Sequence, residues 1–89
     1  MTMLQTYQTY PKVTAVAPLP NKRLRVTFAN GVVRTYDCTA LLADPAFRPL
    51  ADEALFRSVQ ADPHGYGVVW SDALDLSESE LWLNSVQNA

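Results

Sequence analysis

The chain has 89 residues, 48% of them apolar, with seven Lys or Arg against nine Asp or Glu and a formal net charge of −2. This length allows one domain, and the apolar content excludes global disorder. The net negative charge lacks the overall basic character that is usual for a nucleic-acid binder. Residues 1–10 contain neither a basic start nor an apolar run, and the single Cys38 cannot form an internal disulfide. These features predict a cytoplasmic protein without a signal peptide or a membrane span.

The charges are distributed unevenly along the chain. The first 34 residues contain cations and no acid, whereas the remainder is strongly acidic. The early cations are Lys12, Lys22, Arg23, Arg25 and Arg34. One interpretation is that the two halves pair at solvated surfaces, and the other is that a basic sheet face meets nucleic acid or an acidic partner.

The N-terminal part of the chain predicts one strand. Residues 1–10 have no periodic pattern, so we expect a flexible or edge segment before a single domain over residues 11–89. Residues 13–17 are small or β-branched and lie between two prolines, which favours a short strand with defined ends. Residues 19–22 then reverse the chain.

The following stretch predicts a β-hairpin. Apolar residues occupy every second position from Leu24 to Phe28, which is typical of a strand with one buried face. Asn30 and Gly31 readily take positive φ, as a tight hairpin turn requires. The prediction is therefore a three-stranded antiparallel meander over residues 13–17, 23–29 and 32–36.

The register of this hairpin decides which side chains face solvent. A two-residue turn places Phe28 opposite Val33. A three-residue loop with a bulge at Gly31 would instead set Arg34 beside Val26 on the apolar side. We expect the two-residue turn, whose outer face would carry a polar row of Arg25, Thr27, Arg34 and Tyr36.

Short helices should follow the meander. Asp37 or Thr39 can cap a helix over residues 40–43, which Asp44 and Pro45 end. Pro49 restricts residues 45–50 to a single turn or a loop, because its ring clashes with the preceding helical turn.

A further short helix and a second hairpin are expected next. Asp52 is a helix cap, Glu53 in the first turn suits the helix dipole, and the helix should be over by Ser58. Residues 59–61 and 68–70 then predict two short strands around a loop rich in proline and glycine.

The clearest local signal is the last one. Ser77 and Glu80 form a capping box, flanked by a hydrophobic staple of Leu76 and Leu81. This pattern predicts a helix from residue 78 to about residue 86.

This C-terminal helix is the candidate protein interface. Its apolar side chains spread over about 200°, wider than the stripe of roughly 100° that one-sided packing needs. We expect Leu81 and Val86 to face inward, and Trp82 or Leu83 to stay partly exposed as interface anchors. The alternative is that Trp82 simply covers the sheet edge.

No catalytic, cofactor or metal motif is found in the sequence. His64 and Cys38 are too few for a metal site that needs three or four ligands. Ser71 with His64 and a nearby aspartate can be written as a triad, but triads are defined by geometry, and no nucleophile motif supports this one. The glycines at 65 and 67 lack the Lys-Ser/Thr and the helix of a phosphate loop. We therefore expect no enzyme and no cofactor.

The order of these elements resembles domain-of-unknown-function family 2442 over about residues 11–83. The resemblance rests on Pro11-Lys12-Val13, Leu24-x-Val26-x-Phe28-x-Asn30-Gly31, Tyr36-Asp37, Leu41-Leu42, Phe47-x-x-Leu50, Leu55-Phe56, and Trp70 followed by Asp75-Leu76-Ser77. It implies a small bacterial protein with an α+β fold of antiparallel strands and short helices. Some relatives carry a helix-turn-helix DNA-binding domain, and others are encoded beside a second small protein in pairs suggested to act as toxin and antitoxin. The family has no established catalytic residues.

Two functional hypotheses follow. The first is a non-catalytic protein-binding module, antitoxin-like or regulatory, whose partner is another small protein or a second copy. The alternative is a nucleic-acid-binding domain that uses a basic strand face of Arg23, Arg25 and Arg34.

Overall fold

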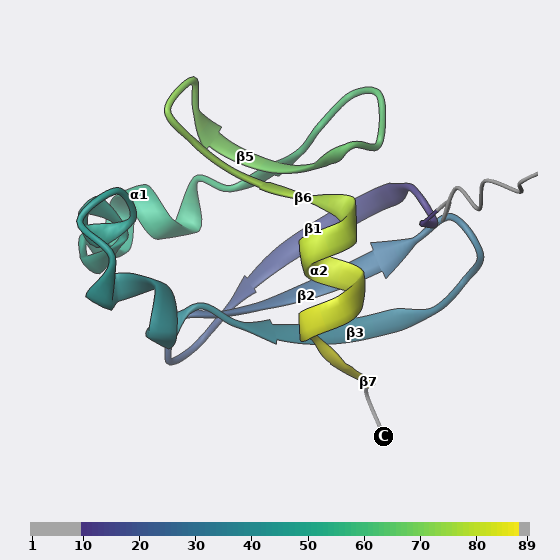
Figure 1. Cartoon of the computed structure of the whole chain (residues 1–89), viewed down its shortest axis with the longest axis horizontal. Helices are drawn as coiled ribbons and strands as arrows, with labels where there is room; N and C mark the ends of the chain where they lie inside the picture. The colour runs from purple at the N-terminus through teal and green to yellow at the C-terminus, as the bar shows by residue number, and fades with distance from the viewer. Residues whose placement is uncertain (1–9, 88–89) are drawn as a thin grey trace, which may run out of the picture.

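The computed structural model describes residues 10–87, and it confirms an α+β fold of two antiparallel sheets with short helices (Figure 1). The prediction for residues 1–10 lies outside the described residues except at Tyr10. Sheet A has the order β1-β2-β3-β7, and its strands are β1 (Val13–Leu19), β2 (Arg23–Phe28), β3 (Val33–Asp37) and β7 (Val86–Gln87). Sheet B has the order β4-β5-β6, with strands β4 (Gln60–Ala61), β5 (Gly67–Ser71) and β6 (Leu74–Ser77). The helices are η1 (Thr39–Ala43), η2 (Arg48–Ala51), α1 (Glu53–Arg57) and α2 (Glu78–Asn84), of which the first two are 3₁₀ helices.

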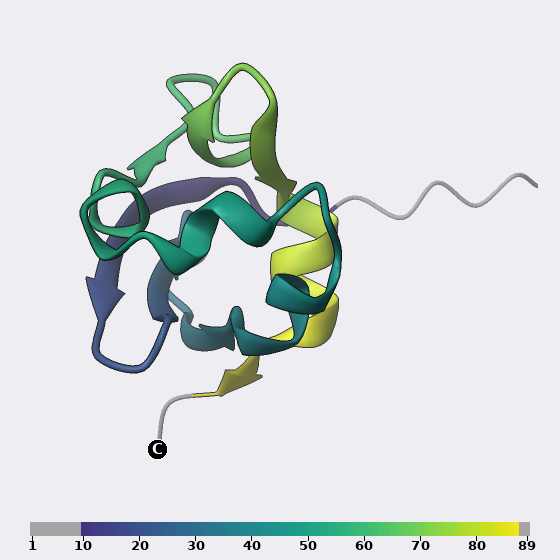
Figure 2. The same cartoon turned by 90° about the vertical axis from the view of Figure 1, so that its left-hand side faces the viewer.

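One hydrophobic core joins the two sheets. Figure 2 shows sheet B at the top, α2 on the right and the first strands on the left, arranged around this core. The fully buried side chains come from both sheets, both α-helices and the connecting segments. The largest are Phe28, Phe56, Leu24, Leu50, Leu81, Val26, Val68 and Cys38.

The meander is confirmed, but the expected hairpin register is wrong. In the structure Arg34 lies opposite Val26, and Val33 lies opposite Thr27. The backbone N–H of Phe28 donates to the carbonyl of Val32 at 2.9 Å, which leaves a three-residue loop. Gly31 in this loop has φ +88°, as expected for a bulge glycine.

Burial of Tyr36 explains why the register with the three-residue loop forms. In the observed pairing Tyr36 lies opposite Leu24 on the inner face, where only 4% of its surface is exposed. A shift by one residue would bring Thr35 inside in its place. Because an aromatic ring buries far more apolar area than threonine, the core favours the three-residue loop.

The predicted segments after the meander are largely confirmed. The helix after the meander forms as the 3₁₀ helix η1, and Asp44 follows its end. Asp37 accepts from the backbone N–H of Thr39 at 2.9 Å, but the N-cap of η1 is Cys38 without a side-chain cap bond, so the expected cap at Asp37 or Thr39 is wrong. The carboxylate of Asp52 accepts from the N–H groups of Ala54 and Leu55 and caps α1, which stops before Ser58.

The C-terminal helix begins as predicted and ends earlier. Ser77 accepts from the backbone N–H of Glu80 at 3.2 Å, which is one half of the capping box. Glu80 itself accepts from the hydroxyl of Tyr36 at 2.8 Å. The helix ends at Asn84, and the expectation that Val86 faces inward is wrong, because this residue belongs to β7 and is 67% exposed.

Two strands were not predicted. β6 has an alternating burial pattern over Leu74–Ser77, so the period of two was visible in the sequence beside the stronger capping signal. β7 has only two residues, which pair antiparallel with Arg34 and Thr35 of β3.

Candidate interaction surface

Sheet A has one face that no other helix or strand within residues 10–87 buries. We call it the open face, and its residues are Ala15, Ala17, Leu19, Arg23, Arg25, Thr27, Val33, Thr35, Asp37 and Val86. None of these ten residues is buried, whereas the inner positions of β2 are completely buried. Small, apolar and charged side chains are mixed on the open face, which is therefore accessible to a macromolecule.

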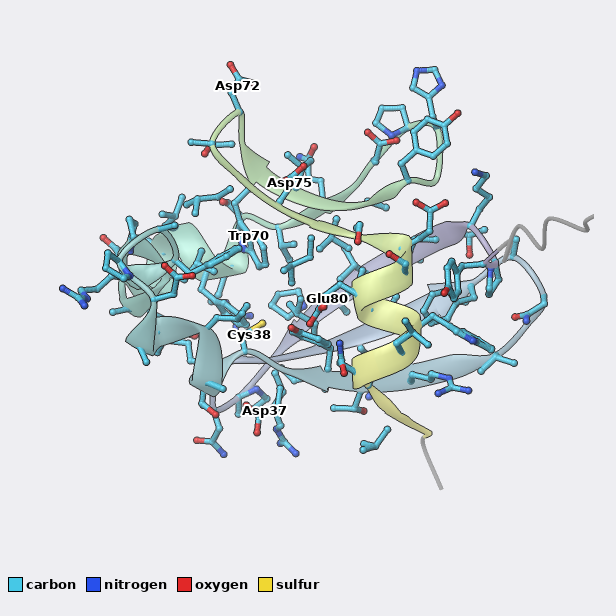
Figure 3. The ribbon with its side chains drawn as sticks, in the orientation of Figure 1. Asp37, Cys38, Trp70, Asp72, Asp75 and Glu80 are labelled. Atoms are coloured by element: carbon cyan, nitrogen blue, oxygen red, sulfur yellow. The ribbon has the colours of Figure 1, made fainter. Side chains whose placement is uncertain are left out.

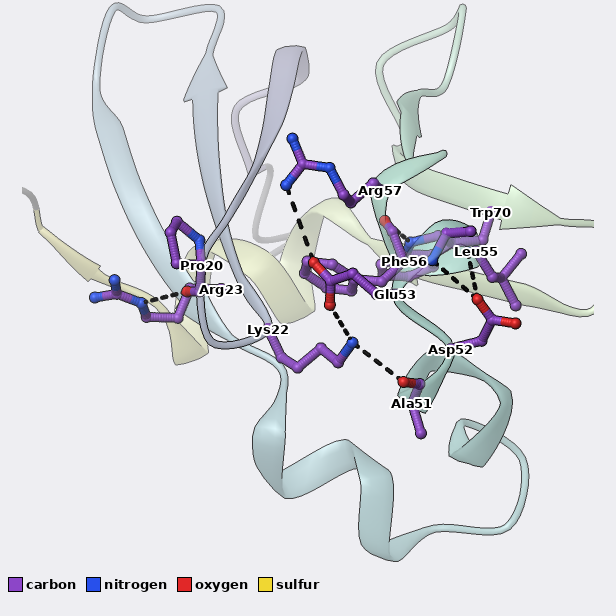
Figure 4. Close-up of polar contacts among 11 residues, drawn as sticks. Pro20, Lys22, Arg23, Ala51, Asp52, Glu53, Leu55, Phe56, Arg57 and Trp70 are labelled. Atoms are coloured by element: carbon purple, nitrogen blue, oxygen red, sulfur yellow. Dashed lines mark hydrogen bonds and ion pairs between the residues drawn. The ribbon is translucent and has the colours of Figure 1, made fainter.

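Two of the three predicted arginines lie on the open face. Arg23 donates through Nε to the carbonyl of Pro20 at 3.1 Å (Figure 4). It lies opposite Asp37 in the pairing of β2 with β3. Arg25 lies opposite Thr35 and is exposed. Within residues 10–87 its side chain has no hydrogen bond or ion pair, so its charge is available to a ligand.

Asp37 reduces the positive charge of this face. The pKa of its carboxyl is lowered, first by the backbone N–H of Thr39, then by the hydroxyl of Thr39, with a smaller contribution from Arg23. Figure 3 shows the carboxylate pointing away from the interior, while Cys38 next to it points inward. An ionised Asp37 thus accompanies the two arginines.

Arg34 is on the other side of the sheet, so the predicted row of three arginines is wrong. Its guanidinium carbon lies 3.9 Å from the ring centroid of Trp82, and Nη1 donates to the carbonyl of Trp82 at 3.3 Å. The contacts of Arg34 therefore stabilise the packing of α2 against sheet A. The register change is the reason, because it moves every side chain of β3 to the opposite face.

The two predicted anchors on α2 have different environments. Trp82 packs edge to face on Phe28, with ring centroids 5.0 Å apart, and is half-buried. This agrees with the alternative that Trp82 covers the sheet. Leu83 is 61% exposed and Val86 is 67% exposed, so two of the large exposed apolar side chains among the described residues lie at the end of α2 and in β7, and Tyr66 in the β4–β5 loop is a third.

Most other cations are paired with glutamates. Lys22 contacts Glu53 at 2.5 Å and the carbonyl of Ala51 at 3.3 Å, which joins the β1–β2 turn to α1 (Figure 4). Lys12 lies 3.2 Å from Glu78 at the start of α2. The two charge halves of the sequence therefore pair in part, as the first interpretation predicts.

The side chains considered for catalysis or metal binding each have local contacts of their own. Burial raises the pKa of the Cys38 thiol to about 12, with a smaller contribution from Asp37, so the sulfur stays protonated and unreactive at neutral pH. The ring of His64 lies beside Tyr66, whereas the hydroxyl of Ser71 accepts from the backbone N–H of Ala73. Over residues 10–87 no three of the His, Cys, Asp and Glu side chains gather at a possible metal site.

The hollow on sheet B is small. It has a volume of about 80 Å³ and is lined by Asp62, Tyr66, Gly67, Val68, Val69, Asp75 and Leu76. Pockets for organic ligands typically measure about 300 to 1,000 Å³, so this hollow holds at most a few atoms. Among the described helices none has the length and apolar character of a membrane span.

Residues 10–87 define a small α+β domain in which one sheet face is not buried. The chain belongs to the family described as Protein of unknown function (DUF2442), whose sequence pattern matches residues 13–87. The resemblance inferred from the sequence is thereby confirmed. No curated protein matches the chain.

A similar solved structure is the crystal structure of "Putative DNA Binding Protein NE0471" from Nitrosomonas europaea. It has 33% sequence identity and a TM-score of 0.66, over 80% of this chain and 46% of that one. The chain thus spans about half the length of the Nitrosomonas protein.

Proposed function

We propose that this chain is a non-catalytic protein-binding module, antitoxin-like or regulatory, and that its partner is another small protein. The observation that carries the proposal is the exposure of Leu83 and Val86, which lie three residues apart at the end of α2 and in β7. Exposed apolar side chains mark a protein interaction site when they form a patch, and Leu83 and Val86 would both belong to such a patch. No cofactor and no catalytic step belong to this proposal.

The open face extends this apolar surface and adds a charge. Val86 lies next to Thr35, which lies opposite Arg25. The side chain of Arg25 has no ion pair within residues 10–87, and an exposed arginine beside small side chains suits a carboxylate on a partner surface. The resemblance to proteins encoded beside a second small protein supports a protein as the partner.

The second candidate function is nucleic-acid binding through Arg23 and Arg25. The name of the Nitrosomonas protein, which includes the words DNA binding, favours this candidate. Two observations weaken it: Asp37 lies opposite Arg23, and Arg34 is held by Trp82. Affinity for nucleic acid depends on the number of phosphates neutralised. Two arginines beside one carboxylate provide little net positive charge for this.

A comparative pull-down tests the first candidate. Wild type and the double variant Leu83→Glu, Val86→Lys are used as baits in lysate of the native host, and captured proteins are identified by mass spectrometry. We expect one stoichiometric small protein with wild type and its loss with the double variant. Tyr66→Lys is the matched control, because Tyr66 is similarly exposed but lies in the β4–β5 loop. Equal capture by all three baits would contradict the proposed surface.

Gel shifts test the second candidate. Wild type and the double variant Arg23→Ala, Arg25→Ala are mixed with duplex DNA at roughly 50 mM salt, where phosphate contacts are strong. A complex that forms with wild type and is lost with the variant would favour nucleic acid. The absence of any complex with wild type removes this candidate.

A further inference from the structure

The edge of sheet A at β7 exposes backbone hydrogen-bonding groups. Cys38 donates to the carbonyl of Lys22 at 2.8 Å and Phe28 donates to that of Val32 at 2.9 Å, so even-numbered residues of β3 bond toward β2. The N–H and C=O groups of successive residues point to opposite sides of a strand. Those of Thr35 therefore point toward β7, where Thr35 pairs with Val86. By the same alternation, the N–H and C=O of Gln87 point away from β3, out of the sheet.

Within residues 10–87, this edge lacks the usual protection against strand pairing. Natural edge strands are shielded by charged side chains, prolines, bulges or covering segments, but the residues Leu83-Asn84-Ser85-Val86-Gln87 include neither a charge nor a proline. The opposite edge is protected, because β1 contains Pro18 and the N–H of Val13 donates to the carbonyl of Gly65 at 2.9 Å. Sheet A thus has one guarded edge and one unguarded edge.

The outer side of α2, which lies near the unguarded edge at β7, is also uncharged at Ser79 and Leu83. Leu83 is two residues from the fully buried Leu81, about 200° around the helix, so it points away from the core. Figure 2 shows α2 above β7 on the same side of the molecule. Ser79 lies one turn before Leu83 on this side, and neither residue is charged.

We propose that this edge is an interface between two copies of the chain, in which β7 pairs antiparallel with β7 of the second copy and sheet A becomes an eight-stranded sheet. A twofold axis brings identical surfaces together, so like charges at the edge would oppose pairing. The uncharged strand and the apolar Leu83 meet this requirement. The occupant is therefore a second copy. It would cover Leu83, whereas Val86 and Arg25 on the open face stay exposed and can contact another partner.

The interface is small, which sets the expected affinity. Stable specific interfaces bury about 1,200 to 2,000 Å² in total. Two short strands and one side of a helix of seven residues lie below that range. The dimer should consequently be weak, with a dissociation constant in the micromolar range or higher.

Sedimentation velocity over a wide range of concentrations tests this proposal. We expect wild type to pass from monomer to dimer as its concentration rises. Gln87→Pro removes an N–H that points out of the sheet, a position where an edge strand tolerates proline. Losing one donor from each copy should weaken self-association at least about tenfold. Gln87→Ala, which keeps the N–H, should match wild type.

A second variant keeps the test valid if Gln87→Pro fails to fold. Leu83→Glu places two like charges near the twofold axis and should also prevent dimerisation, while circular dichroism confirms the fold. A wild-type chain that stays monomeric throughout overturns the proposal, and so does a folded Gln87→Pro variant that associates like wild type. Gln87→Pro keeps the side chains of Leu83 and Val86. A pull-down with this variant therefore measures capture of a different protein independently of self-association.

Discussion

The guanidinium of Arg34 lies over the ring of Trp82, with 3.9 Å between its central carbon and the ring centroid. This contact joins the middle of β3 to the last turn of α2. It forms on the inner side of sheet A, where the ring of Trp82 also packs on Phe28. Arg34 therefore has a structural role, and the open face has two arginines where the sequence indicated three.

Removal of this contact should destabilise the fold. Arg34→Ala loses the cation–π contact and the hydrogen bond to the carbonyl of Trp82, and we expect the free energy of unfolding to fall by about 1 to 2 kcal/mol. Arg25→Ala on the open face is the matched control and should change it by less than about 0.5 kcal/mol. Urea denaturation measures both variants. Equal effects would contradict the structural role of Arg34.

Gly31 should be required for the hairpin loop. Its φ of +88° is unfavourable for β-branched residues, so Gly31→Val should cost about 1 to 3 kcal/mol. No heavy atom lies within 4 Å of the position a Cβ would take, so backbone strain is the cause. Gly31→Asn should be milder, because asparagine tolerates positive φ. A thermal melt in which the Val variant matches wild type would refute this requirement.

Gly67 should tolerate no side chain. A Cβ on this residue would lie 1.9 Å from the carbonyl oxygen of Leu76, and its φ is +146°. Gly67→Ala should therefore cost more than about 2 kcal/mol, because the backbone of β6 must move. The yield of folded protein and its melting temperature measure the effect. Melting at the wild-type temperature would mean that β5 and β6 are spaced more widely.

Stability should decrease in alkaline solution. Burial raises the pKa of Cys38 from 9.0 to about 12, so above pH 9 the thiol ionises more readily in the unfolded chain. The raised pKa thus contributes stability below pH 9 that is lost as the pH rises toward 12. Urea denaturation at increasing pH should show this decline, and Cys38→Ala should show a shallower one.

Tyr36 should contribute to the same decline. Burial raises the pKa of its phenol above the ordinary value of 10.0, and the hydrogen bond to Glu80 raises it further. The stability that this group contributes is present below pH 10 and is lost above it. The Tyr36→Phe variant should therefore lose less stability above pH 10 than wild type. An identical decline in both proteins would contradict ionisation of Tyr36 as a cause.

Local signals in the sequence were sufficient for most elements. The alternation from Leu24 to Phe28 specified β2, and the side-chain oxygens of Asp52 and Ser77 specified the starts of α1 and α2. These signals act within a few residues of the chain, through hydrogen bonds to the nearest backbone N–H groups. They remain valid whatever surrounds them.

The candidate surface was less predictable, because it depends on which face of a strand is buried. Asn30-Gly31 is compatible with both loop lengths, and the side chain of Asn30 accepts from the N–H of Val32 in the loop that forms. Contacts of Tyr36 with Glu80 and of Arg34 with Trp82 stabilise this register. Both partners come from α2, more than 40 residues later in the chain.

The sequence by itself determined the α+β class, the family, the meander and the helix starts, because each follows from periodicity, from caps or from a resemblance in local motifs. Only the tertiary structure decided that Arg34 and Tyr36 face inward, that Val86 leaves the helix for β7, and that Leu83 stays exposed. The physical reason is that a strand has two faces of similar local propensity. Packing between segments distant in the sequence selects the face that is buried.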